Sequence, residues 1–370
     1  MSIEHNKTLV PHNINELKPY VAGKTIQEVV EEYNPTQISK LASNENRLGR
    51  SEKVEGAVQD ALKIVHDYPD PLSKRLRLEI AGKLGVELSN VMVGSGSESI
   101  LAGLCRTFFN NRENLVTADA TFIGVFVQAK IRGIKLKKIP LTNGYRFDLK
   151  GMLNAIDEHT KMIYIANPNN PTGTYVNKEE FEWFMKEVPN DVLVIMDEAY
   201  YEYASSNGDY PDVLSYGFEN VVVLRTFSKA YGLAGFRVGY AVANEEIIQY
   251  LIKTKLAFEP GTLGQAAAEA AFKDSEFLER GMEIVQRGKE DLYSYFDEKG
   301  IGYVRSLANF VMMTFDTEEE AIYFTDEMLK KGVILRRINA FGLPNCVRVT
   351  IGLPSEMKHF KESLEVVLGK

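Results

Sequence analysis

The stretch LRTFSKAYGLAGFRVGY, residues 224–240, follows the apolar run VVV and predicts a buried strand that ends in a polar turn. In that turn Ser228 and Lys229 stand side by side, and Arg237 comes two residues before Gly239. A lysine ammonium is costly to bury unless it is paired or has lost its charge. Lys229 at the end of a buried strand therefore indicates a chemical role, which the rest of the chain must specify.

Three other apolar runs end in polar turns in the same way. They are NVMVGSGSES at 90–99, KMIYIANPNNPTG at 161–173 and DVLVIMDEAYYEY at 191–203. Helix-like segments separate the runs, and Asn177 is placed to cap one of them. Apolar strands alternating with helices predict an α/β fold, with a mostly parallel sheet that is covered on both faces. In such sheets the ligand site lies beyond the carboxyl ends of the strands.

Each of these turns also has an ordinary structural interpretation. The Gly/Ser turn at 94–99 either is a simple tight turn or offers backbone N–H groups at Ser97 and Glu98 to a phosphate. The turn at 167–173 either is only a turn or aims an asparagine amide into the site. Asp197 either caps a helix or, after an entirely apolar strand, is poorly solvated and needs a cationic or N–H partner.

Taken together, the four strand ends supply what pyridoxal phosphate requires. Its aldehyde needs a lysine amine, its ring nitrogen a carboxylate, its phenolic oxygen hydrogen-bond donors, and its phosphate N–H groups and an arginine. Lys229, Asp197, Tyr200 and Arg237 provide these groups beside the Gly/Ser turn. The sequence thus predicts a pyridoxal phosphate site in which Lys229 is held as a Schiff base.

The chain is long enough for more than one domain. It has 370 residues, and one large domain with a smaller one is the natural expectation. We expect an N-terminal segment, 1–49, that packs on the small domain or on a partner subunit. A large cofactor-binding domain at 50–265 and a small C-terminal α+β domain at 266–370 follow, because the alternating pattern gives way to a long helical region there.

Composition excludes several classes of function. The formal net charge is −8, and the chain has no basic block with interleaved aromatic residues, which argues against a nucleic acid partner. We find no signal peptide and no apolar run long enough to cross a membrane. Cys105 and Cys346 indicate no disulfide framework, and five histidines form no metal-ligand pattern. These features predict a metal-free, cytoplasmic enzyme with two buried thiols.

At these motifs the sequence resembles the fold type I pyridoxal-phosphate aminotransferases of class I and II, most closely their histidinol-phosphate branch. The resemblance extends over LKPYVAGKTIQEV, LASNEN, YPDP, NPNNPTG, DEAYYEY, RTFSKAYGLAGFRVGY and VILRRINAFGLPNCVRVTIG. It implies the aspartate-aminotransferase-like architecture, with a mostly parallel, seven-stranded sheet in the large domain.

The resemblance also implies a role for each matching residue. Lys229 forms the Schiff base and moves the proton, Asp197 pairs with the pyridine nitrogen, and Tyr200 and Asn170 hold the phenolic oxygen. The remaining predicted contacts are Ser228, Arg237, Ser97 and Glu98 to the phosphate, Phe122 to the pyridine face, Arg336 and Arg348 to the anionic substrate group, and Tyr20 to the substrate pocket. Tyr68 would reach the phosphate of the cofactor that the neighbouring subunit binds, which implies a homodimer.

The implied reaction transfers the amino group of L-histidinol phosphate to 2-oxoglutarate. An aminotransferase for aromatic or other amino acids and a decarboxylase of a phosphorylated amino acid share the scaffold and stay open as alternatives. A regulatory pyridoxal-phosphate-binding module is a third alternative, against which the lack of a basic DNA-binding segment argues.

The sequence departs from the family pattern at four positions. Arg47 and Arg50 stand where prolines are common, Glu98 where Asp or Asn is commoner, and Ala120 where a proline is usual. Because these loops should lie near the substrate, we expect the departures to bear on substrate choice and not on the cofactor.

Overall fold

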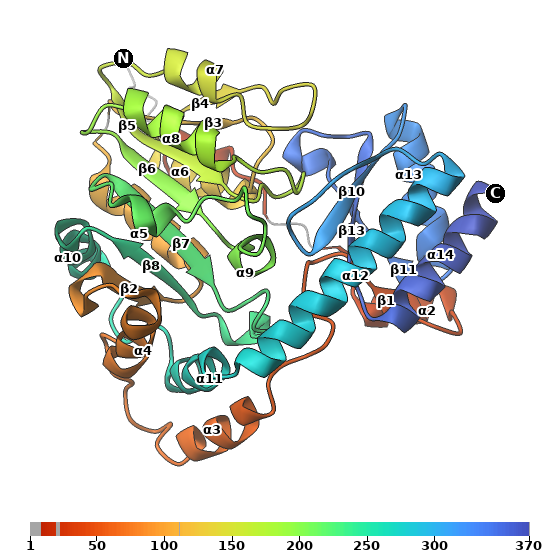
Figure 1. Cartoon of the computed structure of the whole chain (residues 1–370), viewed down its shortest axis with the longest axis horizontal. Helices are drawn as coiled ribbons and strands as arrows, with labels where there is room; N and C mark the ends of the chain where they lie inside the picture. The colour runs from red at the N-terminus through yellow and green to blue at the C-terminus, as the bar shows by residue number, and fades with distance from the viewer. Residues whose placement is uncertain (1–8, 20–22, 111, 370) are drawn as a thin grey trace, which may run out of the picture.

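The computed structural model describes residues 9–19, 23–110 and 112–369 (Figure 1). Within them the largest sheet has seven strands in the order β2-β8-β7-β6-β5-β3-β4. β8 is antiparallel to both of its neighbours, so β2 and β7 run in the same direction, and all other pairs are parallel. The bounds are β2 (Val91–Gly94), β3 (Asn114–Ala118), β4 (Lys135–Ile139), β5 (Thr160–Ala166), β6 (Leu193–Asp197), β7 (Val221–Thr226) and β8 (Gly239–Ala243).

Helices cover both faces of this sheet, as predicted. One face packs on α5, α6 and α10, and the other on α7 and α8. The helices of this part are α3 (Lys53–Leu62), α4 (Lys74–Leu84), α5 (Ser97–Phe108), α6 (Ile123–Arg132), α7 (Leu149–Asn154), α8 (Lys178–Glu187), α9 (Tyr201–Ala204), α10 (Glu245–Thr254) and α11 (Thr262–Phe272). The four predicted strands are β2, β5, β6 and β7, and Asn177 caps α8 through Glu180 N–H.

A second, smaller sheet lies at the other end of the molecule. Its order is β12-β13-β10-β9, and all of its pairs are antiparallel. The elements of this part are α12 (Ser275–Lys299), β9 (Tyr303–Val304), β10 (Phe310–Thr314), α13 (Glu318–Lys330), β11 (Val333–Ile334), β12 (Arg336–Arg337), β13 (Cys346–Thr350) and α14 (Pro354–Leu368). In Figure 1 the long helix α12 runs from beside α11 into this smaller body, so it joins the two parts.

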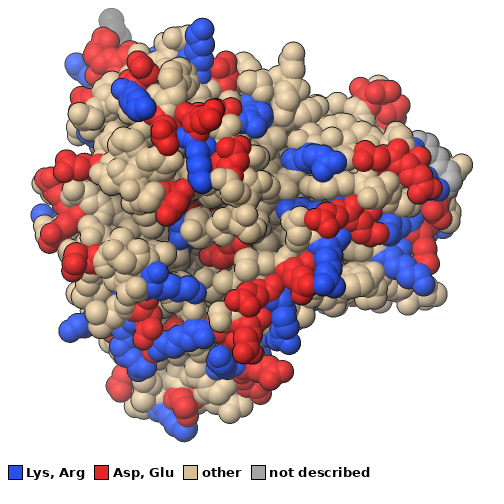
Figure 2. Space-filling view, in the orientation of Figure 1, with Lys and Arg blue, Asp and Glu red and all other residues tan. Residues whose placement is uncertain are grey.

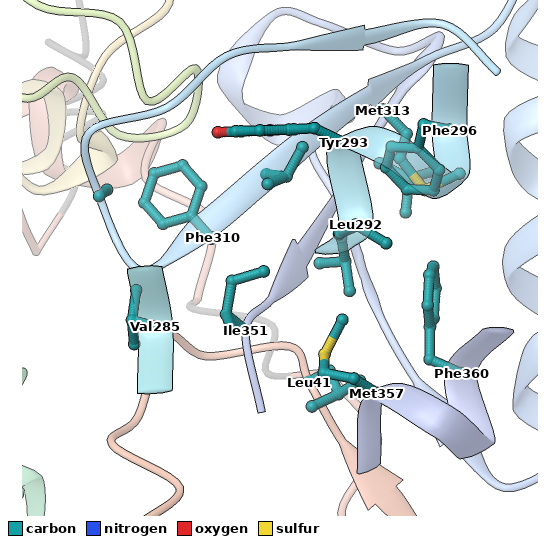
Figure 3. Packing of buried hydrophobic residues seen from close by; sticks show 14 of the residues in the cluster. Leu41, Val285, Leu292, Tyr293, Phe296, Phe310, Met313, Ile351, Met357 and Phe360 are labelled. Atoms are coloured by element: carbon teal, nitrogen blue, oxygen red, sulfur yellow. The ribbon is translucent and has the colours of Figure 1, made fainter. Parts of the chain in front are cut away.

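The core of the smaller body forms where α12 meets the small sheet and α14. Figure 3 shows Leu292 and Phe296 of α12 beside Phe360 of α14, with Phe310 and Ile351 lying along the same helix. All five side chains are almost wholly buried. Burying a side chain of this size contributes about 1.5–3 kcal/mol, so this cluster holds the small sheet against the helix.

The N-terminal segment contacts both bodies. β1 (Ser39–Lys40) pairs in parallel with β11, and α2 (Ile26–Tyr33) lies near α13. From the sequence we expect residues 1–49 to pack on the small domain or on a partner subunit, but α1 (His12–Asn15) packs on α6 of the large body. The physical reason is that Asn13 Nδ2 donates to the carbonyls of Lys130 and Ile131 in the last turn of α6, where the regular i+4 helical donors end.

Charged side chains of both signs are interspersed on the face drawn in Figure 2. Among the described residues no helix combines the length and the apolar character that crossing a membrane requires. Both cysteines are buried thiols, as expected.

Candidate active site

A cavity of about 220 Å³ lies where β2, β5, β6 and β7 end. Because these strands run in one direction, their carboxyl ends meet at one edge of the sheet. Nine of the predicted residues line this cavity: Ser97, Glu98, Phe122, Asn170, Asp197, Tyr200, Ser228, Lys229 and Arg237. The predicted convergence of four separate turns on one site is therefore confirmed.

Lys229 follows β7 and is partly buried, with its side chain reaching into the cavity. Its Nζ donates to the Ser43 carbonyl at 3.1 Å. Burial lowers the pKa of Lys229 to about 8, and the charges of Arg348 and Arg237 act in the same direction. A proton lost this easily makes the amine available as a nucleophile and as a base near neutral pH.

Asp197 ends β6 and is 5% exposed. Its carboxylate accepts hydrogen bonds from the Tyr164 hydroxyl at 2.6 Å and from Ala199 N–H at 3.2 Å. Burial raises the pKa of Asp197 to about 6, and these two donors and Lys229 oppose that rise. A buried carboxylate with neutral donors on both oxygens is suited to pair with a cationic group that enters the cavity.

The opposite end of the cavity is built for an anion. The 12-residue helix α5 begins at Ser97 and directs its first N–H groups there. Arg237 Nη1 lies 3.3 Å from Ser228 Oγ, so a guanidinium and a hydroxyl face the helix end. Gly96, beside them, has a φ of +84°, a backbone conformation that a residue with a Cβ adopts only with strain. A Cβ on Gly239 would stand 2.4 Å from Ser97 N.

These groups fit pyridoxal phosphate, the cofactor that the sequence predicts. The cavity offers a weakly basic amine, a buried carboxylate, an anion cup and an aromatic ring, Phe122. Lys229 would hold its aldehyde carbon, Asp197 its ring nitrogen, and Ser97, Ser228 and Arg237 its phosphate. Gly239 keeps the anion cup open at backbone level, because a Cβ there would crowd the backbone of Ser97.

A larger cavity of about 790 Å³ shares Lys229, Phe122, Asn170 and Tyr200 with the first. Arg336 and Arg348 line it as well. Arg348 is 5% exposed, and it donates to the Ala42 carbonyl at 3.0 Å and to Asn170 Oδ1. The structure thus places both predicted substrate arginines in the lining of a cavity that Lys229 also lines.

Two predicted residues are not part of these cavities. Tyr68 is 81% exposed and stacks on Phe258, with 4.3 Å between ring centroids, in a different region of the surface. Tyr20 lies outside the described residues. In this structure Tyr68 therefore does not line the site of its own chain.

The departures from the family pattern have separate explanations. Arg47 pairs with Glu356 at 2.7 Å and Arg50 with Glu55 at 3.0 Å, so both guanidinium groups have protein partners. Ala120 is buried, and its carbonyl accepts from Asn169 Nδ2. Of the four, only Glu98 lines the cavities.

Sequence reasoning missed several residues of the site. Thr226 lines the cavity and its hydroxyl accepts from Ser228 N–H, while Asn44 donates to the Tyr200 hydroxyl at 2.8 Å. Tyr164 binds Asp197 from the neighbouring strand. Thr226, next to the predicted turn, could have been found from the sequence, whereas Asn44 and Tyr164 required knowledge of strand register and domain packing.

Comparisons with known proteins agree with this geometry. The family model for class I and II aminotransferases matches residues 36–364. Histidinol-phosphate aminotransferase of Geobacillus sp. (strain WCH70) is 42% identical over 354 residues, 95% of this chain and 96% of that protein. The enzyme of the same name from Anoxybacillus flavithermus is 40% identical, over 93% of this chain and 92% of that one. The crystal structure of histidinol-phosphate aminotransferase from Sinorhizobium meliloti in complex with pyridoxal-5′-phosphate has a TM-score of 0.89 at 26% identity, covering 99% of both chains.

Proposed function

The chain belongs to the class I and II aminotransferases, and from this membership we propose that it transfers the amino group of L-histidinol phosphate to 2-oxoglutarate. Enzymes of this family use pyridoxal phosphate with an amino donor and a keto-acid acceptor. The proposed products are imidazole-acetol phosphate and glutamate, which places the reaction in histidine biosynthesis. The names of the relatives at 40–42% identity support this substrate.

The observation that carries the proposal is the pair of arginines beside Lys229. Arg336 and Arg348 are partners in the β12–β13 ladder, and both line the larger cavity. A guanidinium pair suits the phosphate of one substrate and the carboxylates of the other. The phosphate is tetrahedral and the carboxylate is planar, but each is an oxyanion that accepts paired N–H bonds. The same cavity can therefore serve the two half-reactions.

When bound, pyridoxal phosphate supplies the carbonyl group that takes up the amino group and the conjugated ring that delocalises the electrons released at Cα. The protein supplies the proton transfers and the orientation. Lys229 Nζ is the base that removes the Cα proton of the donor, since its lowered pKa, about 8, leaves part of it neutral near physiological pH. Asp197 would stay ionised against a cationic ring nitrogen, and the α5 N-terminus and Arg237 would hold the phosphate in place.

We also propose that the active form is a homodimer in which Tyr68 serves the partner subunit's site. Its exposed ring lies away from the cavity of its own chain. Large apolar side chains are exposed around it, namely Leu62, Ile64, Val65, Leu72, Leu256 and Phe258. Such a surface is typical of a region that another chain covers.

Two buried thiols without a disulfide support a reducing, cytoplasmic setting.

The test is a spectroscopic titration of the purified holoenzyme. L-histidinol phosphate should convert the near-visible band of the bound cofactor to the pyridoxamine form at far lower concentration than phenylalanine or glutamate does. Better conversion by phenylalanine would make the chain an aromatic aminotransferase. Carbon dioxide release without any keto acid would identify a decarboxylase. Failure to bind pyridoxal phosphate at all would overturn the assignment of Lys229.

A further inference from the structure

The hydroxyl of Tyr164 lies against the Asp197 carboxylate, which lines the cofactor cavity. Tyr164 is 0% exposed, and its hydroxyl donates to Asp197 Oδ2 at 2.6 Å. Among the described residues, the cavity lining includes Asp197 and Ala166 but not Tyr164. The phenol therefore reaches the site only through Asp197.

The sheet register accounts for this contact. β5 and β6 are parallel neighbours in which Ala166 pairs with Asp197 and Tyr164 pairs with Ile195. Side chains alternate along a strand, so Tyr164 lies on the same face of β5 as Ala166. The long phenol ring can thus extend forward by two residues, past the Ile165–Met196 pair, to Asp197 at the end of β6. Its ring is packed in the hydrophobic cluster that contains Ile195 and Leu224, which fixes its position.

Toward the ionised Asp197 carboxylate the neutral phenol acts as a donor. Burial and the neighbouring Asp197 carboxylate hold the pKa of Tyr164 well above its ordinary value. The other Asp197 oxygen, Oδ1, accepts from Ala199 N–H at 3.2 Å. Other titratable groups that interact electrostatically with Asp197 are Lys229 after β7, Glu98 of α5, Tyr200 and the adjacent Glu198. In addition to these electrostatic interactions, the Tyr164 hydroxyl donates a hydrogen bond to the Asp197 carboxylate.

We propose that Tyr164 is a positioning residue that orients Asp197 and keeps it ionised for the cationic ring nitrogen of the cofactor. This inference rests on the proposed role of Asp197 in the proposed function. A donor that binds the charged form of a carboxylate favours that form. Without the phenol, fewer groups oppose the effect of burial, which favours the protonated form of Asp197. A larger fraction of the carboxyl is then protonated at any pH near its pKa.

The sign of the pH effect follows from this. Removing the Tyr164 donor raises the pKa of Asp197, so the variant loses the ionised carboxylate at a higher pH than the wild type does. Cofactor affinity of the variant should therefore fall most at low pH. The affinity should return toward the wild-type value once the pH exceeds the pKa of Asp197 in both the wild type and the variant. A loss of packing alone would weaken binding equally at every pH.

The experiment measures the dissociation constant of pyridoxal phosphate for Tyr164→Phe and for the wild type at about pH 6 and about pH 8.5. Absorption of the bound cofactor gives the readout without any turnover. Phenylalanine keeps the ring in the cluster, so the fold is retained, and thermal unfolding of the apo proteins verifies it. Tyr293→Phe is the matched control, because its buried hydroxyl accepts from Ser306 N–H at 2.9 Å in the small body, far from Asp197 along the chain.

We expect the ratio of the two dissociation constants, variant over wild type, to be about ten at the lower pH and to approach one at the higher pH. Tyr293→Phe should keep a ratio near one throughout. The inference is overturned if the Tyr164→Phe ratio is one at both pH values, or if the ratio differs from one but does not change with pH. Either result leaves the proposed function intact. Failure of the wild type itself to bind pyridoxal phosphate is the separate result that overturns the proposed function.

Discussion

Arg336 and Arg348 are directly opposite each other on the antiparallel strands β12 and β13. Their side chains share one face of the small sheet and line the cavity beside Lys229. Like charges in a cross-strand pair repel each other. An anion between them relieves that repulsion, so the pair favours a substrate with a phosphate or carboxylate group.

The two arginines should govern affinity for both substrates. Arg336→Gln is expected to lower kcat/KM for the amino donor and for 2-oxoglutarate by about 10- to 100-fold, because a charge-assisted hydrogen bond is lost. Most of the change should appear in KM. Arg337→Gln is the control, since Arg337 forms an ion pair with Glu318 at 2.8 Å and does not line the cavity. Equal losses in the two variants would contradict a role for Arg336 in substrate binding.

Lys229→Ala should abolish transamination, because among the described residues Lys229 is the lysine that lines the cofactor cavity, where both the nucleophilic amine and the Cα base are needed. Treatment with borohydride, which fixes pyridoxal phosphate covalently to a lysine, should label the wild type and leave the variant unlabelled. Lys150→Ala, at an exposed position in α7, should behave as the wild type in both assays. Substantial turnover by Lys229→Ala would refute the assignment.

The pKa of Lys229 predicts how the apo enzyme captures its cofactor. The rate of covalent capture should rise with pH through about 8 and then level, because only the neutral amine attacks an aldehyde. Arg348 lowers the pKa of Lys229 and Glu45 raises it. Arg348→Gln should therefore move the midpoint to higher pH, and Glu45→Gln to lower pH. Stopped-flow absorption measures both, and shifts in the same direction would show that the lysine is not the titrating group.

Asp197→Ala should bind pyridoxal phosphate more weakly and turn over about 100-fold more slowly, since a buried cationic ring nitrogen loses its partner. Equilibrium dialysis gives the first quantity and steady-state kinetics the second. Asp316→Ala removes an exposed aspartate that also follows a strand, and it should change neither. Wild-type cofactor affinity in Asp197→Ala would exclude the proposed pairing.

Mixed dimers test whether Tyr68 acts across the interface. Tyr68→Ala and Lys229→Ala are each expected to be impaired as homodimers. A heterodimer of the two has one site with neither defect if Tyr68 serves the partner subunit, and about half of the wild-type activity should return. If Tyr68 served its own chain, each site would carry one defect, and no activity would be recovered on mixing.

Local patterns were sufficient to predict much of the fold. Apolar runs before Gly94, Asn167 and Asp197 predicted β2, β5 and β6, because a continuous Val/Ile/Met stretch must be buried on both faces. Asn177 predicted the start of α8, since its side chain satisfies the N–H group of Glu180. The N-terminal segment was predicted less well, because no local signal in residues 12–15 indicates that Asn13 binds the end of α6.

By itself the sequence determined the chemistry of this protein. Lys229, Asp197, Tyr200 and Arg237 each end or follow a buried strand, and parallel strands bring their carboxyl ends to one edge, so composition and order alone predict the site. Tertiary structure decided what surrounds that chemistry. The contact of Tyr164 with Asp197 depends on the register of β5 against β6, and the placement of Arg336 opposite Arg348 depends on the register of β12 against β13. Register is set by packing among residues distant along the chain, and no short stretch of sequence contains that information.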